Sequence, residues 1–145
     1  MRYVSLFVVM ILSLCLVSGC KKGGGGSGGG GTTPPPPPPT EADLVVSLNP
    51  ASGSVQAPAL GPFSVTVSIT STMPANGVKI EISAKKDDGS GAAPYFTVNE
   101  NTTATTKTYN ITNTPVNVQC LVEVKVTSLT KATNVWTGSY RYSSK

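Results

Sequence analysis

Cys20 is the residue whose surroundings point most directly to covalent chemistry. It follows the apolar run Tyr3–Val17 and the small residues Ser18 and Gly19. A thiolate is a strong nucleophile, and small neighbours leave the backbone open to a processing enzyme. With basic Arg2 in front, the segment has the layout of a secretory signal. Because the run is shorter than the roughly 20 apolar residues that span a bilayer, we expect it to be cleaved.

The stretch Val17-Ser18-Gly19-Cys20 resembles the lipobox of bacterial lipoproteins, in which an aliphatic and two small residues precede an invariant cysteine. The resemblance implies diacylglyceryl transfer to the Cys20 thiol, cleavage before Cys20, and attachment to the membrane by this N-terminal lipid. Each acyl chain adds about 0.8 kcal/mol per buried methylene. Lys21 stands where inner-membrane lipoproteins of enteric bacteria carry aspartate, so the outer membrane is favoured. The alternative is an ordinary signal peptide with an incidental cysteine.

A second set of candidate residues is aromatic: Trp136, Tyr140 and Tyr142 share parity on an expected strand, with Tyr95 as a candidate neighbour. Rings on one sheet face can stack on sugar rings, which is the basis of a glycan-binding site. Core residues show the same parity, and we favour the core interpretation. Gly138 leaves this face less filled and keeps the glycan alternative open.

Acid–base and metal chemistry has little support. The chain contains no histidine, which removes Ser-His-Asp and Cys-His arrangements and the commonest metal ligand. Asp87 and Asp88 lie in a glycine-rich turn beside Lys85 and Lys86, which indicates a solvated hairpin tip and not a calcium loop. We therefore expect no enzymatic activity, no metal site and no cofactor.

The formal net charge of +4 overstates how basic the folded part is. Arg2 lies in the expected signal, and Lys21 and Lys22 follow Cys20. From Glu41 onward the chain has eight basic and seven acidic residues. A segment this close to neutrality lacks the basic surface that binds nucleic acid, so we expect no nucleic-acid partner.

Composition divides the chain into three parts: residues 1–19 as signal peptide, 20–40 as lipidated cysteine and disordered tether, and 41–145 as one domain. Gly23–Gly31 is a glycine tract with one serine, which we expect to be a flexible coil of about 16 Å. Pro34–Pro39 favours a polyproline II rod of about 19 Å. A cloning linker or a ligand for an aromatic groove is a weaker interpretation of these tracts.

Period-two alternation begins at Leu44 and is typical of half-buried strands. The expected strands cover residues 44–48, 63–69, 78–84, 95–98, 105–111, 116–126 and 135–142. Polar alternation excludes a buried parallel sheet and predicts an all-β, antiparallel, immunoglobulin-like β-sandwich of about seven strands. The pattern resembles immunoglobulin-like and fibronectin type III-like domains of bacterial exported proteins, without the Cys…Trp…Cys signature. Cys120 shares parity with five valines, so we expect it to fill the core.

These observations predict a lipid-anchored, non-enzymatic lipoprotein of the cell envelope that acts in adhesion, protein interaction or envelope structure. Exposed sheet edges and the loops Gly53–Ala57 and Lys85–Gly91 are expected to contact a protein partner. The alternative is a carbohydrate-binding accessory module of a glycan-utilisation system, which would bind its glycan through Trp136 and its neighbours.

Overall fold

The computed structural model describes residues 40–145, so the expected signal, Cys20 and most of the tether lie outside the described residues. Residues 40–145 contain seven strands and no helix, and thus no helix long and apolar enough to cross a membrane. The strands are β1 (Val46–Asn49), β2 (Phe63–Ile69), β3 (Val78–Lys86), β4 (Phe96–Thr102), β5 (Thr106–Ile111), β6 (Gln119–Ser128) and β7 (Val135–Ser143).

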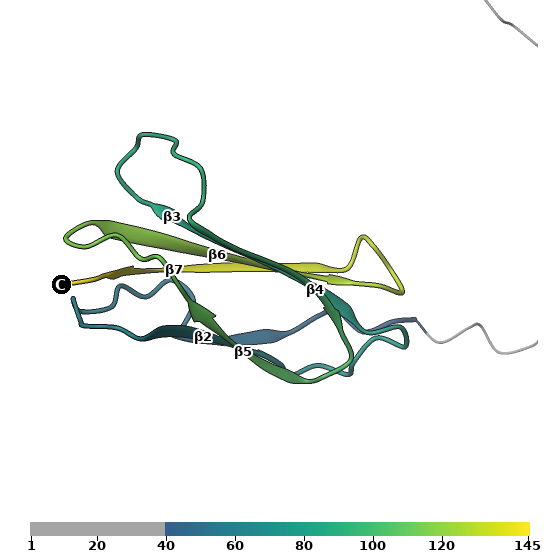
Figure 1. Ribbon diagram of the computed structural model, residues 1–145. Coiled ribbons are helices and arrows are strands. Elements are labelled where there is room, and N and C mark those ends of the chain that lie inside the picture. Colours follow the sequence, from purple (N-terminus) through teal and green to yellow (C-terminus); the bar gives the residue numbers. More distant parts are fainter. Residues whose placement is uncertain (1–39) are drawn as a thin grey trace, which may run out of the picture. The chain divides into compact units, whose positions relative to one another are not determined.

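The strands form two antiparallel sheets packed as a sandwich (Figure 1). One sheet has the order β1-β2-β5 and the other the order β4-β3-β6-β7. The fourth strand pairs with the third from Val78↔Thr102 to Ala84↔Phe96. In constant-type immunoglobulin domains the fourth strand joins the first, second and fifth instead. The predicted all-β sandwich is confirmed, with β4 on the larger sheet.

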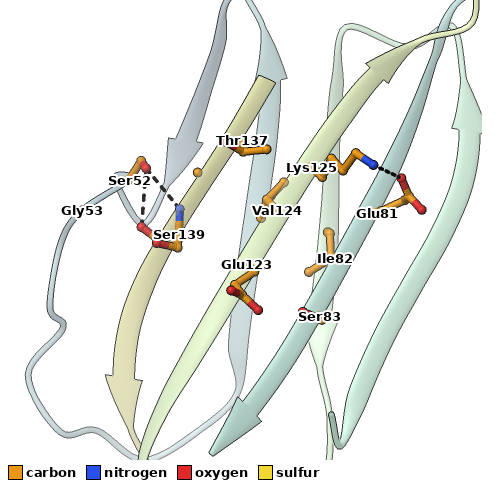
Figure 2. Close-up of a pocket in the computed structure, with 11 residues that line it drawn as sticks. Ser52, Gly53, Glu81, Ile82, Ser83, Glu123, Val124, Lys125, Thr137 and Ser139 are labelled. Atoms are coloured by element: carbon orange, nitrogen blue, oxygen red, sulfur yellow. Dashed lines mark hydrogen bonds and ion pairs between the residues drawn. The ribbon is translucent and has the colours of Figure 1, made fainter. Parts of the chain in front are cut away.

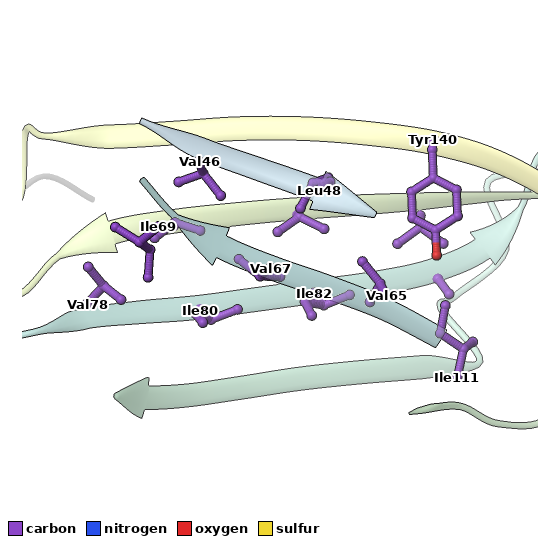
Figure 3. Close-up of a cluster of buried hydrophobic side chains, with 14 of the residues drawn as sticks. Val46, Leu48, Val65, Val67, Ile69, Val78, Ile80, Ile82, Ile111 and Tyr140 are labelled. Atoms are coloured by element: carbon purple, nitrogen blue, oxygen red, sulfur yellow. The ribbon is translucent and has the colours of Figure 1, made fainter. Parts of the chain in front are cut away.

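The core consists of the inward-facing residues of both sheets, in the parity that the sequence predicts (Figure 3). Val65 and Val67 of β2 face Ile80 of β3, and all three are fully buried. Each such side chain contributes about 1.5–3 kcal/mol of hydrophobic stabilisation. Cys120 is also fully buried and unpaired with any described cysteine, which confirms its expected place in the core.

Two strand boundaries differ from the prediction by three residues or more, and several others by one or two residues. β6 begins at Gln119, and Val116 forms only an isolated bridge with Ser144 while 59% of its surface stays exposed. Pro115 has no N–H to donate to a ladder, and Asn117 adopts a positive φ of 59°, so the chain turns before the strand starts. β4 extends to Thr102, beyond the expected end at residue 98.

The connection between β1 and β2 covers the outer edge of β7. Val55 and Ala59 make parallel bridges with Arg141 and Ser144. Backbone bonds along this seam include Gly53 N–H to Ser139 O at 2.6 Å and Gln56 N–H to Arg141 O at 2.8 Å. Because the edge backbone is already paired, β7 is not a template for another strand.

Antiparallel pairing carries the chain back and forth between two ends of the sandwich. The entry end receives the chain at Thr40 and holds the connections 70–77, 103–105 and 129–134. The distal end lies opposite and holds the connections 50–62, 87–95 and 112–118 together with Lys145 (Figure 1). The two ends differ in the length and exposure of their connections, and for that reason the distal end is the candidate contact surface.

Candidate functional site

The distal end gathers both loops that the sequence marked as contact segments, Gly53–Ala57 and Lys85–Gly91. The connection 112–118 lies at the same end, where Asn117 N–H donates to Ser144 O at 2.9 Å. Among residues 40–145, six large hydrophobic side chains are exposed, three at each end, and the three most exposed lie on the distal connections: Val55 (64% exposed), Leu60 (77%) and Val116 (59%). The other three, Val45, Leu129 and Val135 at the entry end, are 56%, 39% and 42% exposed. The distal connections therefore carry the more exposed apolar groups, which favours them as a contact surface.

The loop between β3 and β4 projects from the sandwich at this end (Figure 1). Its base is fixed, because Asp87 N–H donates to Gln119 O at 2.8 Å and Arg141 Nε lies 2.6 Å from the Asp87 carboxylate. Its tip bends through Gly89 and Gly91 at positive φ. Hydrogen bonds from Ser90 lower the pKa of Asp88, so the tip carries a negative charge at neutral pH. The loop thus has a rigid base and an open tip.

A groove of about 620 Å³ lies on the outer face of the larger sheet, where the β1–β2 connection meets β7 (Figure 2). Small and hydroxyl-bearing residues from three segments line it: Ser52 and Gly53 of the β1–β2 connection, Ser83 of β3, and Thr137, Gly138 and Ser139 of β7. Ser52 Oγ fixes the rim by accepting a bond from Ser139 N–H at 3.2 Å. The groove therefore offers hydroxyl groups on a fixed backbone.

The charges around this groove are paired with one another. Glu81 lies 2.8 Å from Lys79 Nζ and 3.6 Å from Lys125 Nζ. The hydrogen bond from Lys79 lowers the pKa of Glu81 below its ordinary value of 4.5, so Glu81 stays ionised and is a poor proton donor. Glu123 lies 2.7 Å from Lys85 Nζ. This arrangement suits polar contact with a partner better than acid–base catalysis.

Among residues 40–145 there is no cluster of three or more His, Cys, Asp or Glu side chains that could hold a metal ion. Cys20, the predicted lipidation site, lies outside the described residues, and its role stays a prediction.

The structure places the predicted stacking aromatics against the core. Tyr140 and Tyr142 are 3% and 2% exposed, with ring centroids 6.1 Å apart and planes tilted by 40°. Trp136 is half-buried, and its ring occupies the space over Gly138, where an added Cβ would lie 2.3 Å from a ring atom. A sugar ring cannot stack on the two tyrosines without opening the sandwich.

Hydroxyl bonds fix Tyr142, one of the two buried tyrosines, at the distal end of the core. Tyr142 OH lies 2.8 Å from both Tyr95 OH and Thr114 Oγ1. Burial is the main cause that raises the pKa of Tyr95, Tyr140 and Tyr142 above its ordinary value of 10.0. The predicted neighbour Tyr95 is therefore brought to Tyr142, but as part of a structural network.

Sequence analysis missed a polar network at the entry end, formed by Glu41, Ser128 and Asn134. Asn134 and Ser128 are 6% and 2% exposed, and 93 residues separate Asn134 from its partner Glu41. Ser128 offered a weak signal, because it continues the inward parity of Val124 and Val126 with a hydroxyl group. Nothing local to Asn134 distinguishes it from other turn asparagines.

Comparisons with known proteins add no assignment: no family model matches this chain, no curated protein matches it, and no solved structure matches it.

Proposed function

We propose that this chain is a lipid-anchored, non-enzymatic lipoprotein of the bacterial cell envelope that presents its β-sandwich for adhesion, protein interaction or envelope structure. The observation that carries the proposal is the sequence Val17-Ser18-Gly19-Cys20, followed at once by Gly23–Gly31 and Pro34–Pro39. A lipid on Cys20 and an extended tether place the protein at a membrane, with the outer membrane favoured by Lys21.

The construction of the sandwich supports a display role. The tether enters at Thr40, whereas the connections with the most exposed apolar side chains lie at the distal end. A flexible tract of about 16 Å and a proline rod of about 19 Å would hold that surface several nanometres from the bilayer. Loops on a rigid scaffold commonly carry binding. The partner surface is therefore assigned to the distal end.

Replacing the lipidated residue tests the anchor. Cys20→Ser should abolish labelling by a radioactive fatty acid and move the protein from the membrane fraction to the soluble one, or leave the precursor unprocessed. Cys15→Ser, within the apolar run, is the matched control and should change neither readout. Unchanged fractionation and labelling of the Cys20→Ser protein would overturn the proposal.

A carbohydrate-binding module is the second candidate, favoured now by the hydroxyl-lined groove and not by stacked aromatics. Trp136 packs against the core and does not line the groove, but its ring lies over Gly138, a groove residue, so a ligand that moves Gly138 would change the environment of the Trp136 ring. Titration with soluble glucans, xylans, mannans and pectins should change Trp136 fluorescence, and Thr137→Lys should abolish the response. Thr108→Lys, on the outer face of the smaller sheet, is the control. Absence of any response would remove this candidate.

A further inference from the structure

The chain enters the sandwich through the entry strap, defined as residues Glu41–Val45. Asn134, in the turn between β6 and β7, holds the strap with both ends of its amide. Its Oδ1 accepts a bond from Leu44 N–H at 2.9 Å, and its Nδ2 donates to Glu41 Oε1 at 2.5 Å and to Ala42 O at 2.9 Å. Three bonds from a single buried side chain fix both halves of the strap.

Ser128 completes this attachment from the end of β6. Its Oγ donates to Glu41 Oε2 at 3.0 Å, so both oxygens of the Glu41 carboxylate are bonded. The same Oγ accepts bonds from Thr130 N–H and Lys131 N–H, each at 3.0 Å. Ser128 N–H in turn donates to Asn134 O at 3.0 Å. The strap is thereby joined to a turn that is itself closed by backbone bonds.

The other end of the strap is bonded to the smaller sheet. Thr70 N–H donates to Val45 O at 2.8 Å, and Val45 N–H donates to Ser71 Oγ at 3.1 Å. Thr70 and Ser71 follow β2 directly, whereas Asn134 and Ser128 belong to the β6–β7 hairpin of the larger sheet. The entry strap therefore bonds to both sheets before the chain begins β1.

We propose that the entry strap is a tension-bearing clamp, which passes a pull on the tether into both sheets before it reaches β1. The inference rests on the proposed function, because only an anchored chain carries such a pull. Without the clamp the tension would fall on β1, a strand of four residues whose ladder is formed with β2 alone. Charge-assisted bonds to the Glu41 carboxylate are stronger than bonds between neutral groups, which suits this position.

Hydrogen exchange on the full chain tests the clamp without reference to membrane attachment. Asn134→Ala removes the three amide bonds and should raise exchange at Leu44–Asn49 by about tenfold or more. Exchange in the centres of β3 and β6 should stay unchanged. Asn110→Ala, at an exposed position of β5, is the matched control. Unchanged exchange at Leu44–Asn49, or a uniform rise over the whole domain, would overturn the proposal.

Force measurement tests the role directly, with the full chain held at residue 20 and at a tag after Lys145. Glu41→Ala lies outside the strands and avoids the risk that Asn134→Ala fails to fold. It should lower the force of the first unfolding event and release β1 as a separate step, whereas Asn110→Ala should match the parent chain. Equal forces for Glu41→Ala and the parent would overturn the clamp. A failed anchor would instead be revealed by the Cys20→Ser fractionation, with these forces unaffected.

Discussion

The two ends of the sandwich are built differently. At the entry end, side chains tie the incoming chain and the turns to one another, as in the bonds of Asn134 to Glu41 and Leu44. At the distal end, the connections are longer and carry the three most exposed large hydrophobic side chains of residues 40–145, with Leu60 at 77% exposure. The entry end is thus the more closely cross-linked by side chains, whereas the distal end presents the longer and more exposed connections, the kind of segment that commonly carries binding.

Glycine shows the same contrast. Gly77, in the entry-end turn, has a φ of +80°, and a Cβ added there would lie 2.5 Å from Thr102 O. Gly89, in the distal loop, has a φ of +73°, but no atom lies within 4 Å of its added Cβ. The entry turn thus needs glycine for both conformation and space, and the distal loop needs it for conformation alone.

The prediction with the largest expected effect tests whether the exposed connections of the distal end give solvent access to the core. Cys120 lies next to the start of β6 at that end, yet it is fully buried. Its labelling by a thiol reagent should be slower in the folded chain than in the unfolded one by a factor of about a thousand or more. Peptide mapping separates Cys120 from the other cysteines. Rapid labelling of Cys120 in the native protein would show that the distal end opens into the core.

Substitution of the two glycines compares the ends directly. Gly77→Ala should lower the free energy of unfolding by about 3 kcal/mol, because it adds a backbone clash to a strained φ. Gly89→Ala should cost about 1 kcal/mol or less, because only the φ is unfavourable. Chemical denaturation of both variants measures the difference. Equal losses would contradict the distinction between the two turns.

Tyr142 tests the stability of the distal core. Tyr142→Phe should cost about 1–2 kcal/mol, because Tyr95 and Thr114 lose their hydroxyl partner. Burial raises the pKa of these core tyrosines above 10.0, so the stability they contribute is complete below pH 10 and is lost as pH rises through their folded values. Denaturation at a series of alkaline pH values checks this sign. Stability that is constant above pH 10 would contradict it.

The smallest effect concerns the side of the sandwich where β4 and β5 lie. Glu100 of β4 is 2.7 Å from Lys107 Nζ of β5 and accepts a bond from Tyr109 OH at 3.0 Å. The bond from Lys107 is the main cause that lowers the pKa of Glu100 below 4.5. The stability from this pair is therefore present above pH 4.5 and is lost as pH falls through the lowered value. In denaturation at a series of acidic pH values, Lys107→Met should reduce the loss of unfolding free energy below pH 4.5. Lys131→Met, the control, should leave that loss unchanged.

The sequence predicts the strands well because the residues of each strand alternate between apolar and polar, and this pattern can be recognised within the strand itself. Val65, Val67, Ile80 and Cys120 reveal their burial through their immediate neighbours. The start of β6 was misplaced because Val116 keeps the same parity, whereas Pro115 and the positive φ of Asn117 decide where pairing begins. Period alone does not report where a ladder ends.

The remaining features depend on contacts between distant residues. The strap joins Glu41 to Asn134, and the β7 edge is covered by residues 53–59 through backbone bonds that carry no residue signature. The position of β4 in the larger sheet likewise results from its pairing with β3, which the composition of β4 does not reveal. For the aromatic residues, parity favoured the core without excluding stacking, and the buried positions of Tyr140 and Tyr142 come from the packing of two sheets.

The number of times the chain crosses the sandwich has a consequence for engineering. Seven antiparallel crossings are an odd number, so the described chain starts at one end and finishes at the other. A fluorescent protein or an epitope joined after Lys145 would therefore lie beyond the distal end of the sandwich, away from the entry end. Such a fusion would mark the end of the domain opposite Thr40, so that the distance between the two ends could be measured.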